Sequence, residues 1–550
     1  MNRSVEISEE DLSPGLAPGR VGAASIGLLG LAAAAPVVTL VTVVPAVLAD
    51  GAGPLVPWSF AGVGLLLLLF CAGQAATARR SPSAGAAYSQ VTRGLGRPSG
   101  LVAAWLAIAG YHAIQFGLYT LAGLVAAPLL SSFAGLTAPW WAVAAACWAI
   151  VAICGTMRIE VAAGLIGLFA VAQAAVLAGL GAANVLQPFG GRITGDSILI
   201  TDRAVLDRPA LGLLLTVAVL TFAGFESTAA YAEEGFQPRR SAGFGGYGAV
   251  LLIALLLGGV SWTMIVAAGP DRAATIAGAR GPELIFDLAA ERLAPWAVTL
   301  GRFVLLAGVV AAILAVHHAI ARYLFALGRE RVLPAVLGSA RRRTAAPRAA
   351  SMTQSLIAGA ALAGAYAAGA GPGPRTARWL IVGGALSILV VLLLAALAAL
   401  LHLNRVPGPE GVWGRFLAPV PSTVSLASVA FLAVRDLPAL LDMPSGYPLV
   451  RAIPAALLAC VLLAVAHALL LRRFRPVRYA GIGLAGTPVV ITPMAAPSPP
   501  TSPATPASPP SPASHVSHAE PLKIPRQRDP GAHRPERVDP RQPAIRRRSI

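Results

Sequence analysis

One glutamate interrupts a long apolar stretch of this chain. Residues 211–225 contain no charged side chain, and Glu226 follows them directly. A charged side chain at the centre of a membrane span costs about 2.5–3.5 kcal/mol on insertion scales, so a function usually accounts for it. Three functions fit Glu226: a proton carrier, a gate residue, or a partner for a cationic substrate. The alternative is a structural carboxylate that is hydrogen-bonded to a neighbouring helix.

Two more carboxylates, Glu233 and Glu234, lie just beyond this stretch and are followed by Arg239 and Arg240. Their position at the end of an apolar segment favours ion pairs with arginines at a gate over contact with a substrate. The alternative is that both carboxylates are simply solvated.

Two other apolar segments contain polar side chains that could bind a ligand or exchange protons. Tyr111, Gln115 and Tyr119 recur every four residues with His112 beside them, so this stripe should face the protein interior and not lipid. His317 and His318 interrupt a second apolar segment, where an imidazole can exchange protons near neutral pH. Adjacent helical residues point about 100° apart, so we expect the two histidines to serve different sites.

Neither a cofactor nor a metal is indicated by the remaining reactive residues. His, Asp and Glu show no metal-ligand spacing, and no nucleophile elbow occurs, so we expect neither a metal site nor an enzyme. The four cysteines fall in or beside apolar segments, where we expect them to act as small packing residues. They are Cys71, Cys147, Cys154 and Cys460. The alternative is that Cys147 and Cys154 form a redox or metal-binding pair.

The composition is that of a membrane protein. Apolar residues make up 56% of the 550 residues and charged residues only 12%, too few to cover a soluble protein of this length. A spanning helix needs about 20 mostly apolar residues. The hydropathy pattern predicts an all-α protein with twelve spans, of which the fourth is short and the eleventh is weakened by prolines: 21–49, 58–76, 100–129, 139–154, 160–182, 210–230, 243–268, 296–327, 351–370, 380–403, 416–434 and 450–471.

The net charge of +18 belongs mainly to loops and to the C-terminal residues. With both termini inside, arginines are more numerous in the internal loops than in the external ones, as the positive-inside rule requires. A basic protein of this kind is expected to contact the anionic inner leaflet of the lipid bilayer, and we do not expect nucleic-acid binding. The abundance of Ala, Gly and Arg suggests a bacterial plasma membrane, and no cleavable signal peptide is predicted.

Three zones follow from this organisation: a polar cytoplasmic lead over 1–20, a membrane domain over 21–471, and a Pro-rich, basic tail over 472–550. The tail cannot bury a core and is expected to be disordered, either as a passive extension or in a regulatory or lipid-contacting role. The first and sixth spans are both interrupted, by Pro36 and by Gly224. Breaks at corresponding positions of two halves indicate inverted repeats of five spans, with two spans added, and a binding site between them.

Three segments together resemble amino-acid permeases of the amino acid–polyamine–organocation superfamily. They are Ser81-Pro-Ser-Ala-Gly-Ala-Ala-Tyr-Ser-Gln90 with the residues up to Arg97, Phe222-Ala-Gly-Phe-Glu-Ser227 with its Glu-Glu and Pro-Arg-Arg exit, and Ala321-Arg-Tyr-Leu-Phe-Ala-Leu-Gly-Arg329 with the residues up to Pro334. They occur in the family's order and each adjoins a span. The resemblance covers roughly residues 20–470. It implies the inverted five-plus-five fold of the leucine transporter.

The resemblance also implies a substrate site at the two breaks. Free N–H groups near Ala33, Ala34 and Ala35 would hold a substrate carboxylate, and freed carbonyls at Phe222, Ala223 and Gly224 would hold its ammonium group. The family often has a Gly-Ser-Gly type break in the first span, where this chain has Ala and Pro. In the resembled fold the third span lines the substrate path, so Tyr111 or Gln115 would touch the ligand, unless they only join helices.

The same resemblance suggests how transport is coupled. The first and eighth spans hold sodium in sodium-coupled members, and His317 or His318 on the eighth would bring a proton there instead. Some proton-coupled relatives use a lysine on the fifth span, but residues 160–182 contain none. We therefore expect a secondary transporter for an amino acid or related amine that takes up its substrate with protons, sodium being the alternative ion. An exchanger or polyamine porter is the alternative, and a membrane sensor is a further one.

Overall fold

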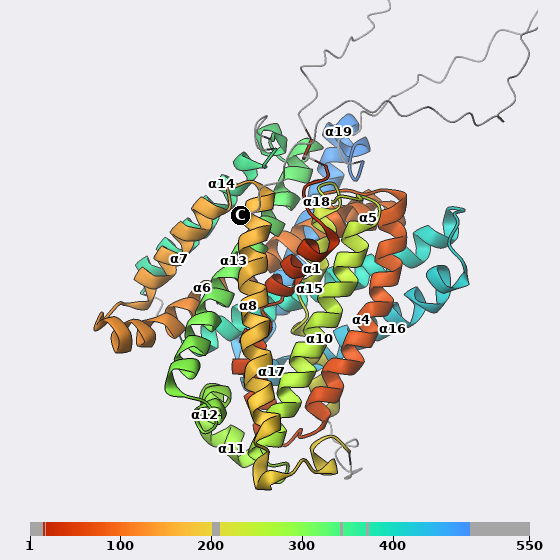
Figure 1. Ribbon diagram of the computed structural model, residues 1–550. Helices are drawn as coiled ribbons and strands as arrows, with labels where there is room; N and C mark the ends of the chain where they lie inside the picture. Colours follow the sequence, from red (N-terminus) through yellow and green to blue (C-terminus); the bar gives the residue numbers. More distant parts are fainter. Residues whose placement is uncertain (1–14, 17, 201–209, 341–344, 370–372, 485–550) are drawn as a thin grey trace, which may run out of the picture. The chain divides into compact units, whose positions relative to one another are not determined.

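Long helices make up most of the structure (Figure 1). It is a computed structural model, described over residues 15–16, 18–200, 210–340, 345–369 and 373–484. Within these residues ten helices are long and apolar enough to cross a membrane. The short apolar helix α7 (Trp140–Cys154) and the more polar α14 (Arg348–Ala367) account for the fourth and ninth predicted spans. Each of the twelve predicted spans is therefore helical, and the all-α membrane fold is confirmed.

Two of the spans are broken and the others are continuous. Span 1 consists of α1 (Ala23–Ala33), α2 (Pro36–Val38), a π-helical turn (Thr39–Val43) and α3 (Val44–Ala49). Span 6 consists of α9 (Ala210–Leu220) and the 3₁₀ helix η6 (Phe225–Tyr231). The remaining long helices are α4 (Leu55–Arg80), α6 (Arg97–Ala134), α8 (Ile159–Leu186), α10 (Ser241–Ala268), α13 (Pro295–Arg329), α15 (Pro374–Arg405), α16 (Pro419–Arg435) and α18 (Pro448–Phe474).

Short helices and turns connect the spans. The α-helical ones are α5 (Ala86–Leu95), α11 (Ala273–Arg280), α12 (Leu284–Ala290), α17 (Leu437–Leu441) and α19 (Pro476–Ala480). The other turns lie at Phe189–Gly191, Gly195–Ser197, Gly281–Glu283, Ala335–Gly338 and Trp413–Leu417. In the described part of the chain, β-pairing is confined to a single bridge between Val21 and Gly235.

Small residues let the central helices pack closely. A Cβ on Gly110 of α6 would lie 2.9 Å from the carbonyl oxygen of Gly384 on α15, so both glycines are needed at this crossing. The hydroxyl of Ser387 on α15 also donates to the carbonyl of Leu106 at 2.8 Å. By contrast, α18 buries only Ala464, Ala468 and Leu471 and exposes its large apolar side chains, as a peripheral span facing lipid would.

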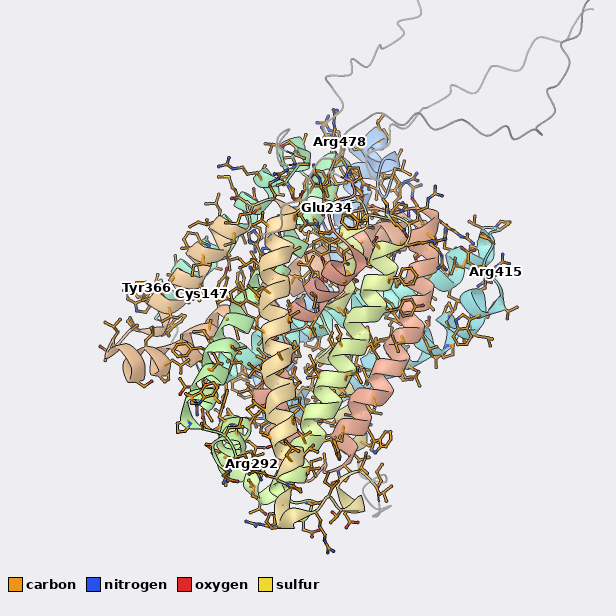
Figure 2. The ribbon with its side chains drawn as sticks, in the orientation of Figure 1. Cys147, Glu234, Arg292, Tyr366, Arg415 and Arg478 are labelled. Carbon is orange, nitrogen blue, oxygen red and sulfur yellow. The ribbon has the colours of Figure 1, made fainter. Side chains whose placement is uncertain are left out.

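The two ends of the helix bundle carry different short elements. At one end, uppermost in Figure 1, lie α5 and α19; at the other lie α11 and α12. Figure 2 places Glu234 toward the first end and Arg292 at the second. We call them the α5 end and the α11 end. At the latter, Gly278 of α11 lies close to Ala49 at the end of span 1, because a Cβ on Gly278 would be 3.7 Å from that of Ala49.

The packed part of the chain continues beyond residue 471, where the sequence places the start of the tail. Helix α18 runs to Phe474, α19 follows, and Ile482 is buried with 1% of its surface exposed. The Pro-rich residues of the predicted disordered tail, from 485 on, lie outside the described residues, as do residues 1–14 and 17 of the lead.

Candidate functional site

The break in span 1 lies between Ala33 and Pro36. Helix α1 ends at Ala33, and Ala35 has a φ of +48°, in the left-handed region. Pro36 accounts for this local conformation, because a proline disfavours helical geometry in the residue before it and has no N–H to donate. The chain resumes with a proline-led turn and a π-helical segment, a form that often marks functional sites.

The break in span 6 lies directly against the break in span 1. Between Leu220 and Phe225 the chain forms turns, and Gly224 has a φ of +120°. A Cβ on Gly224 would come within 2.6 Å of the carbonyl carbon and oxygen of Ala33. Glycine is therefore required here twice over, by its backbone angle and by the contact. The structure brings together the two stretches of irregular backbone that the sequence singled out, Ala33–Ala35 and Phe222–Gly224.

Glu226 sits in the first turn of η6 and is almost fully buried, with 9% of its surface exposed. The backbone N–H of Gly224 donates to its Oε2 at 2.9 Å, and the hydroxyl of Tyr111 on α6 donates to its Oε1 at 2.6 Å. Tyr111 in turn lies against Tyr323 of α13, with ring centroids 6.2 Å apart. Two donors thus hold the carboxylate, one of them from within the break of its own span.

The polar stripe of span 3 divides between two neighbourhoods. Tyr111 contacts Glu226, but Gln115, one turn further along, faces spans 8 and 9. Its Nε2 donates to the carbonyl of Ile313 at 3.4 Å, and its Oε1 accepts from the amide of Gln354 on α14. His112 bonds through Nδ1 to the carbonyl of Ile108 within its own helix, at 2.8 Å. Of this stripe, the structure joins Tyr111 to the breaks and places Gln115 in an interhelical amide pair.

The two histidines of span 8 are both buried and point in different directions, with their ring planes perpendicular. The Nε2 of His317 lies 2.8 Å from the hydroxyl of Ser351 on α14, and that hydroxyl donates to the carbonyl of Gly155. His317 therefore faces spans 4 and 9. The carbonyl of His318 accepts from Arg322 at 3.0 Å.

A buried ion pair joins the exits of spans 6 and 8 toward the α5 end. The Nε of Arg322 on α13 donates to Oε2 of Glu234 at 2.7 Å, and their side chains are 1% and 2% exposed. The guanidinium also lies over the ring of Tyr231, 4.2 Å from its centroid. Removing one member would leave the other charge buried and uncompensated.

A second ion pair lies one step closer to the surface. Arg329, two turns beyond Arg322 on the same face of α13, contacts both carboxylate oxygens of Glu233, at 2.9 and 2.6 Å. Glu233 also accepts from the backbone N–H of Ala84, just before α5, at 2.8 Å. Both glutamates past span 6 thus pair with arginines of span 8 and are not simply solvated.

The segment before α1 also contacts the exit of span 6. The backbone N–H groups of Arg20 and Val21 donate to the carbonyl of Glu234 at 2.8 and 3.1 Å, and Phe236 donates back to Val21 at 2.9 Å. The side chain of Arg20 contacts Glu160 at the start of α8 at 3.0 Å. The starts of spans 1 and 5 and the exits of spans 6 and 8 are therefore tied together at the α5 end.

The partners in these contacts do not follow from the sequence alone. In the sequence, Arg322 and Arg329 stand out only as part of a motif. An arginine inside an apolar span nevertheless requires a buried acceptor, and a spacing of seven places both on one helix face. Ser351 and Gln354 on α14 carried no signal of their own, because two polar residues in a membrane helix commonly join helices.

Broken spans within a bundle of apolar helices are typical of α-helical membrane transporters. The family model described as amino acid permease matches residues 24–487, a range that includes both breaks, Glu226 and the two ion pairs. The chain belongs to the amino acid permease family, within the amino acid–polyamine–organocation superfamily. It is thus a multi-pass membrane protein and a transporter rather than an enzyme. A comparison with curated proteins gave no match.

Proposed function

We propose that this permease takes up an amino acid or related amine together with protons, by opening the α5 end and the α11 end alternately. The observation that carries the proposal is the contact of Glu226 with the break of its own span, at the point where that break meets span 1. A change in the charge of Glu226 would act directly on the backbone that we expect to hold the substrate.

The substrate grip we propose is mainly backbone. The start of α2 presents a positive helix end beside Ala35 for the carboxylate, and irregular backbone at Phe222–Gly224 presents carbonyls for the ammonium group. The N–H groups of Ala34 and Ala35 donate to the carbonyls of Gly30 and Ala32, so they would hold a carboxylate only after leaving those partners. Such contacts fit the part that all amino acids share. Tyr111 would reach the substrate only by leaving Glu226, whereas Gln115 is held by span 9 and is the weaker candidate.

Coupling in this proposal runs through Glu226 in the first place. Its carboxylate accepts from Gly224 and Tyr111, and protonation would remove the charge that both donors stabilise. His317 and His318 are the alternative carriers, although His317 bonds to span 9 and not to span 1. Sodium between spans 1 and 8 is the alternative ion.

The ion pairs at the α5 end would form the gate. Opening that end requires Glu233 and Glu234 to separate from Arg329 and Arg322, or requires span 8 to move with span 6. The arginine-rich loops suggest that the α5 end is cytoplasmic, with both termini inside a bacterial plasma membrane.

Transport by the purified protein in liposomes tests this proposal. With an inward proton gradient, radiolabelled amino acids should accumulate against their own gradient. Glu226→Gln should lower this uphill uptake by about 100-fold, the loss typical of a missing proton carrier, and should retain exchange of internal for external substrate. Glu283→Gln, a change at an exposed carboxylate bonded to Arg302, is the matched control and should leave both activities unchanged.

Two outcomes would redirect the proposal. Unchanged uphill uptake in Glu226→Gln would remove Glu226 from the coupling path. Exchange without any net uptake, in the unaltered protein and at every pH gradient, would establish the alternative of an obligate exchanger.

A further inference from the structure

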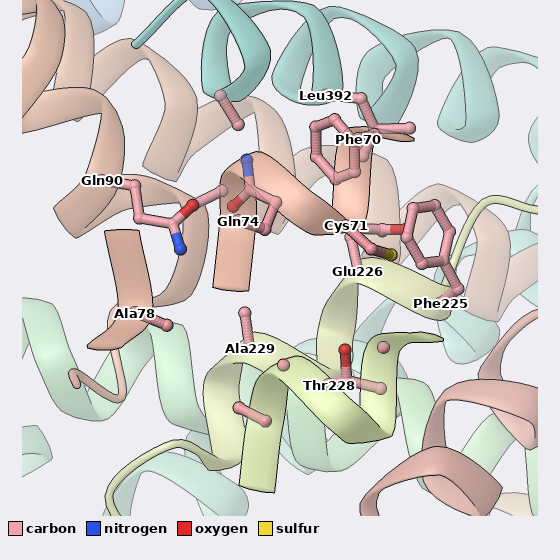
Figure 3. A pocket seen from close by; sticks show the side chains of 15 residues that line it. Phe70, Cys71, Gln74, Ala78, Gln90, Phe225, Glu226, Thr228, Ala229 and Leu392 are labelled. Carbon is pink, nitrogen blue, oxygen red and sulfur yellow. The ribbon is translucent and has the colours of Figure 1, made fainter. Parts of the chain in front are cut away.

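A small cavity adjoins Glu226 on a side that the breaks do not use. It lies among α4, α5, η6, α10 and α15, and Figure 3 shows Cys71, Gln74, Gln90 and Glu226 among the side chains that line it. None of its lining residues belongs to span 1 or span 8. It is therefore separate from the contact between the two breaks and from the ion pairs of the α5 end.

Two glutamine amides in this cavity have polar atoms without a partner. Within the described structure, the buried Gln74 Nε2 donates no hydrogen bond and the buried Gln90 Oε1 accepts none. Gln90 is only 8% exposed. Buried polar atoms almost always have partners, so a polar occupant is indicated. A glutamine amide has both a donor and an acceptor, so each of the two groups can bond to water in either orientation.

The cavity is large enough for water but too small for an amino acid. Its volume is about 30 Å³, which holds two or three water molecules at roughly 10–15 Å³ each and no amino acid. A buried water needs two to four polar partners, and the two glutamines, Glu226 and Thr228 supply them among otherwise apolar walls such as Phe70 and Leu392.

The cavity extends from Glu226 toward the α5 end. Cys71, Gln74 and Ala78 lie on one face of α4 at spacings of three and four. The wall that α4 contributes to the cavity therefore extends about 10 Å along the helix axis. Ala78 is two residues from the end of α4, and Ala242, on the other wall, is the second residue of α10. Gln74 and Gln90 therefore occupy positions between a buried carboxylate and the ends of the helices.

We propose that ordered water in this cavity carries protons between Glu226 and the α5 end, with Gln74 and Gln90 as positioning residues. This rests on the proposed coupling through Glu226. In release, the carboxyl O–H bond breaks, the adjacent water takes the proton, and the electron pair stays on the carboxylate, which Tyr111 and Gly224 then stabilise. The excess proton passes along the hydrogen-bonded waters to the solvent at the α5 end, and loading follows the reverse path.

The groups that face Glu226 permit this path. Tyr111 on α6 and Tyr323 on α13 are phenols, and Cys71 on α4 is a thiol. The walls that α5, α10 and α15 contribute contain no titratable side chain, and none of the described residues that line the cavity is an arginine. A positive charge there would repel an excess proton.

Infrared spectroscopy tests the path without relying on transport. The carboxylic-acid C=O band of protonated Glu226 would be assigned by its loss in Glu226→Gln. After transfer of the unaltered protein to D₂O, this band should shift within the mixing time, because water reaches the carboxyl group. A band that stays unshifted while the fold is intact would overturn the proposal.

Transport variants test the role of the glutamines. The double change Gln74→Leu with Gln90→Leu keeps the side-chain size and removes the polar groups. We expect about a tenfold loss of proton-driven uptake, with substrate exchange retained, and a slower deuterium shift of the Glu226 band. Gln173→Leu, a change at a buried amide of α8 outside the cavity, is the matched control and should alter neither.

The outcomes separate this proposal from the one on which it rests. If a proton gradient drives no uptake in the unaltered protein, proton coupling fails, whatever the infrared result. If uptake is proton-driven and depends on Glu226, but the double variant matches Gln173→Leu in both uptake and deuterium shift, then protons reach Glu226 by another route. Should the double variant fold poorly, Gln90→Leu alone and the infrared shift of the unaltered protein still decide.

Discussion

At the scale of single residues, Gly224, Glu226 and Tyr111 form the centre of this permease. Gly224 lets the break of span 6 touch Ala33, and its N–H holds Glu226. Tyr111 holds the other carboxylate oxygen from span 3. A carboxylate that is bonded to the break of its own helix can couple its charge to the conformation of that break, which a carboxylate elsewhere on the span could not do.

Replacing Gly224 by alanine should disable transport without unfolding the bundle. The new Cβ would meet the backbone of Ala33 and would require a left-handed conformation that costs about 1–3 kcal/mol. We expect substrate exchange to fall at least about tenfold, the rate equivalent of 1.4 kcal/mol. Gly259→Ala on α10, where nothing lies within 4 Å of the new Cβ, should behave as the unaltered protein. Equal exchange rates in the two variants would contradict the required contact.

At the scale of elements, span 8 supplies the arginines that pair with the glutamates at the exit of span 6. Arg322 and Arg329 lie on one face of α13 and reach two consecutive glutamates. The inner pair is fully buried and the outer pair is partly exposed. Partly exposed ion pairs contribute little, whereas breaking a buried one is costly, so the two pairs should differ in their effect on stability.

Removal of Arg322 should destabilise the protein strongly. Arg322→Met leaves the carboxylate of Glu234 buried and unpaired, a change that costs about 3–5 kcal/mol. The apparent melting temperature in detergent should therefore fall markedly. Arg302→Met, at an exposed pair with Glu283, is the control and should change it little.

The double variant completes this test. Adding Glu234→Leu to Arg322→Met removes the unpaired charge, so much of the lost stability should return. If the double variant melts no higher than Arg322→Met alone, then the ion pair is not the source of the loss.

At the scale of the whole molecule, the C-terminal residues of the described region brace the α5 end. The N–H of Gly483 donates to the hydroxyl of Tyr88 on α5 at 3.1 Å and to Glu330 at 3.0 Å, and Ile482 is buried beside it. Burial and the neighbouring Glu330 carboxylate raise the pKa of Tyr88 well above its usual value, so its hydroxyl remains a donor. Residues distant in sequence thus hold α5 in place beside the exits of spans 6 and 8.

Two truncations should separate this brace from the tail. Ending the chain after Phe474 removes Ile482, whose burial contributes about 1.5–3 kcal/mol, and removes the Gly483 N–H that donates to Tyr88 and Glu330. This variant should melt several degrees lower. Ending the chain after Leu484 keeps every described contact of the brace and should leave melting unchanged if residues 485–550 are a passive tail. Equal melting of both truncations would show that the brace adds no stability.

Local features of the sequence determined the twelve helices, the two breaks and the isolated carboxylate. Apolar length, Pro36 and Gly224 act on the few residues beside them, so one sequence is enough to reveal them. The tertiary structure alone decided the pairings. It joined Glu234 to Arg322, 88 positions away, and Glu226 to Tyr111, 115 positions away, and it turned His317 toward span 9 and not span 1. The reason is physical: the partner of a buried polar group depends on the crossing and rotation of whole helices, which arise from packing summed over many distant side chains and leave no local signal.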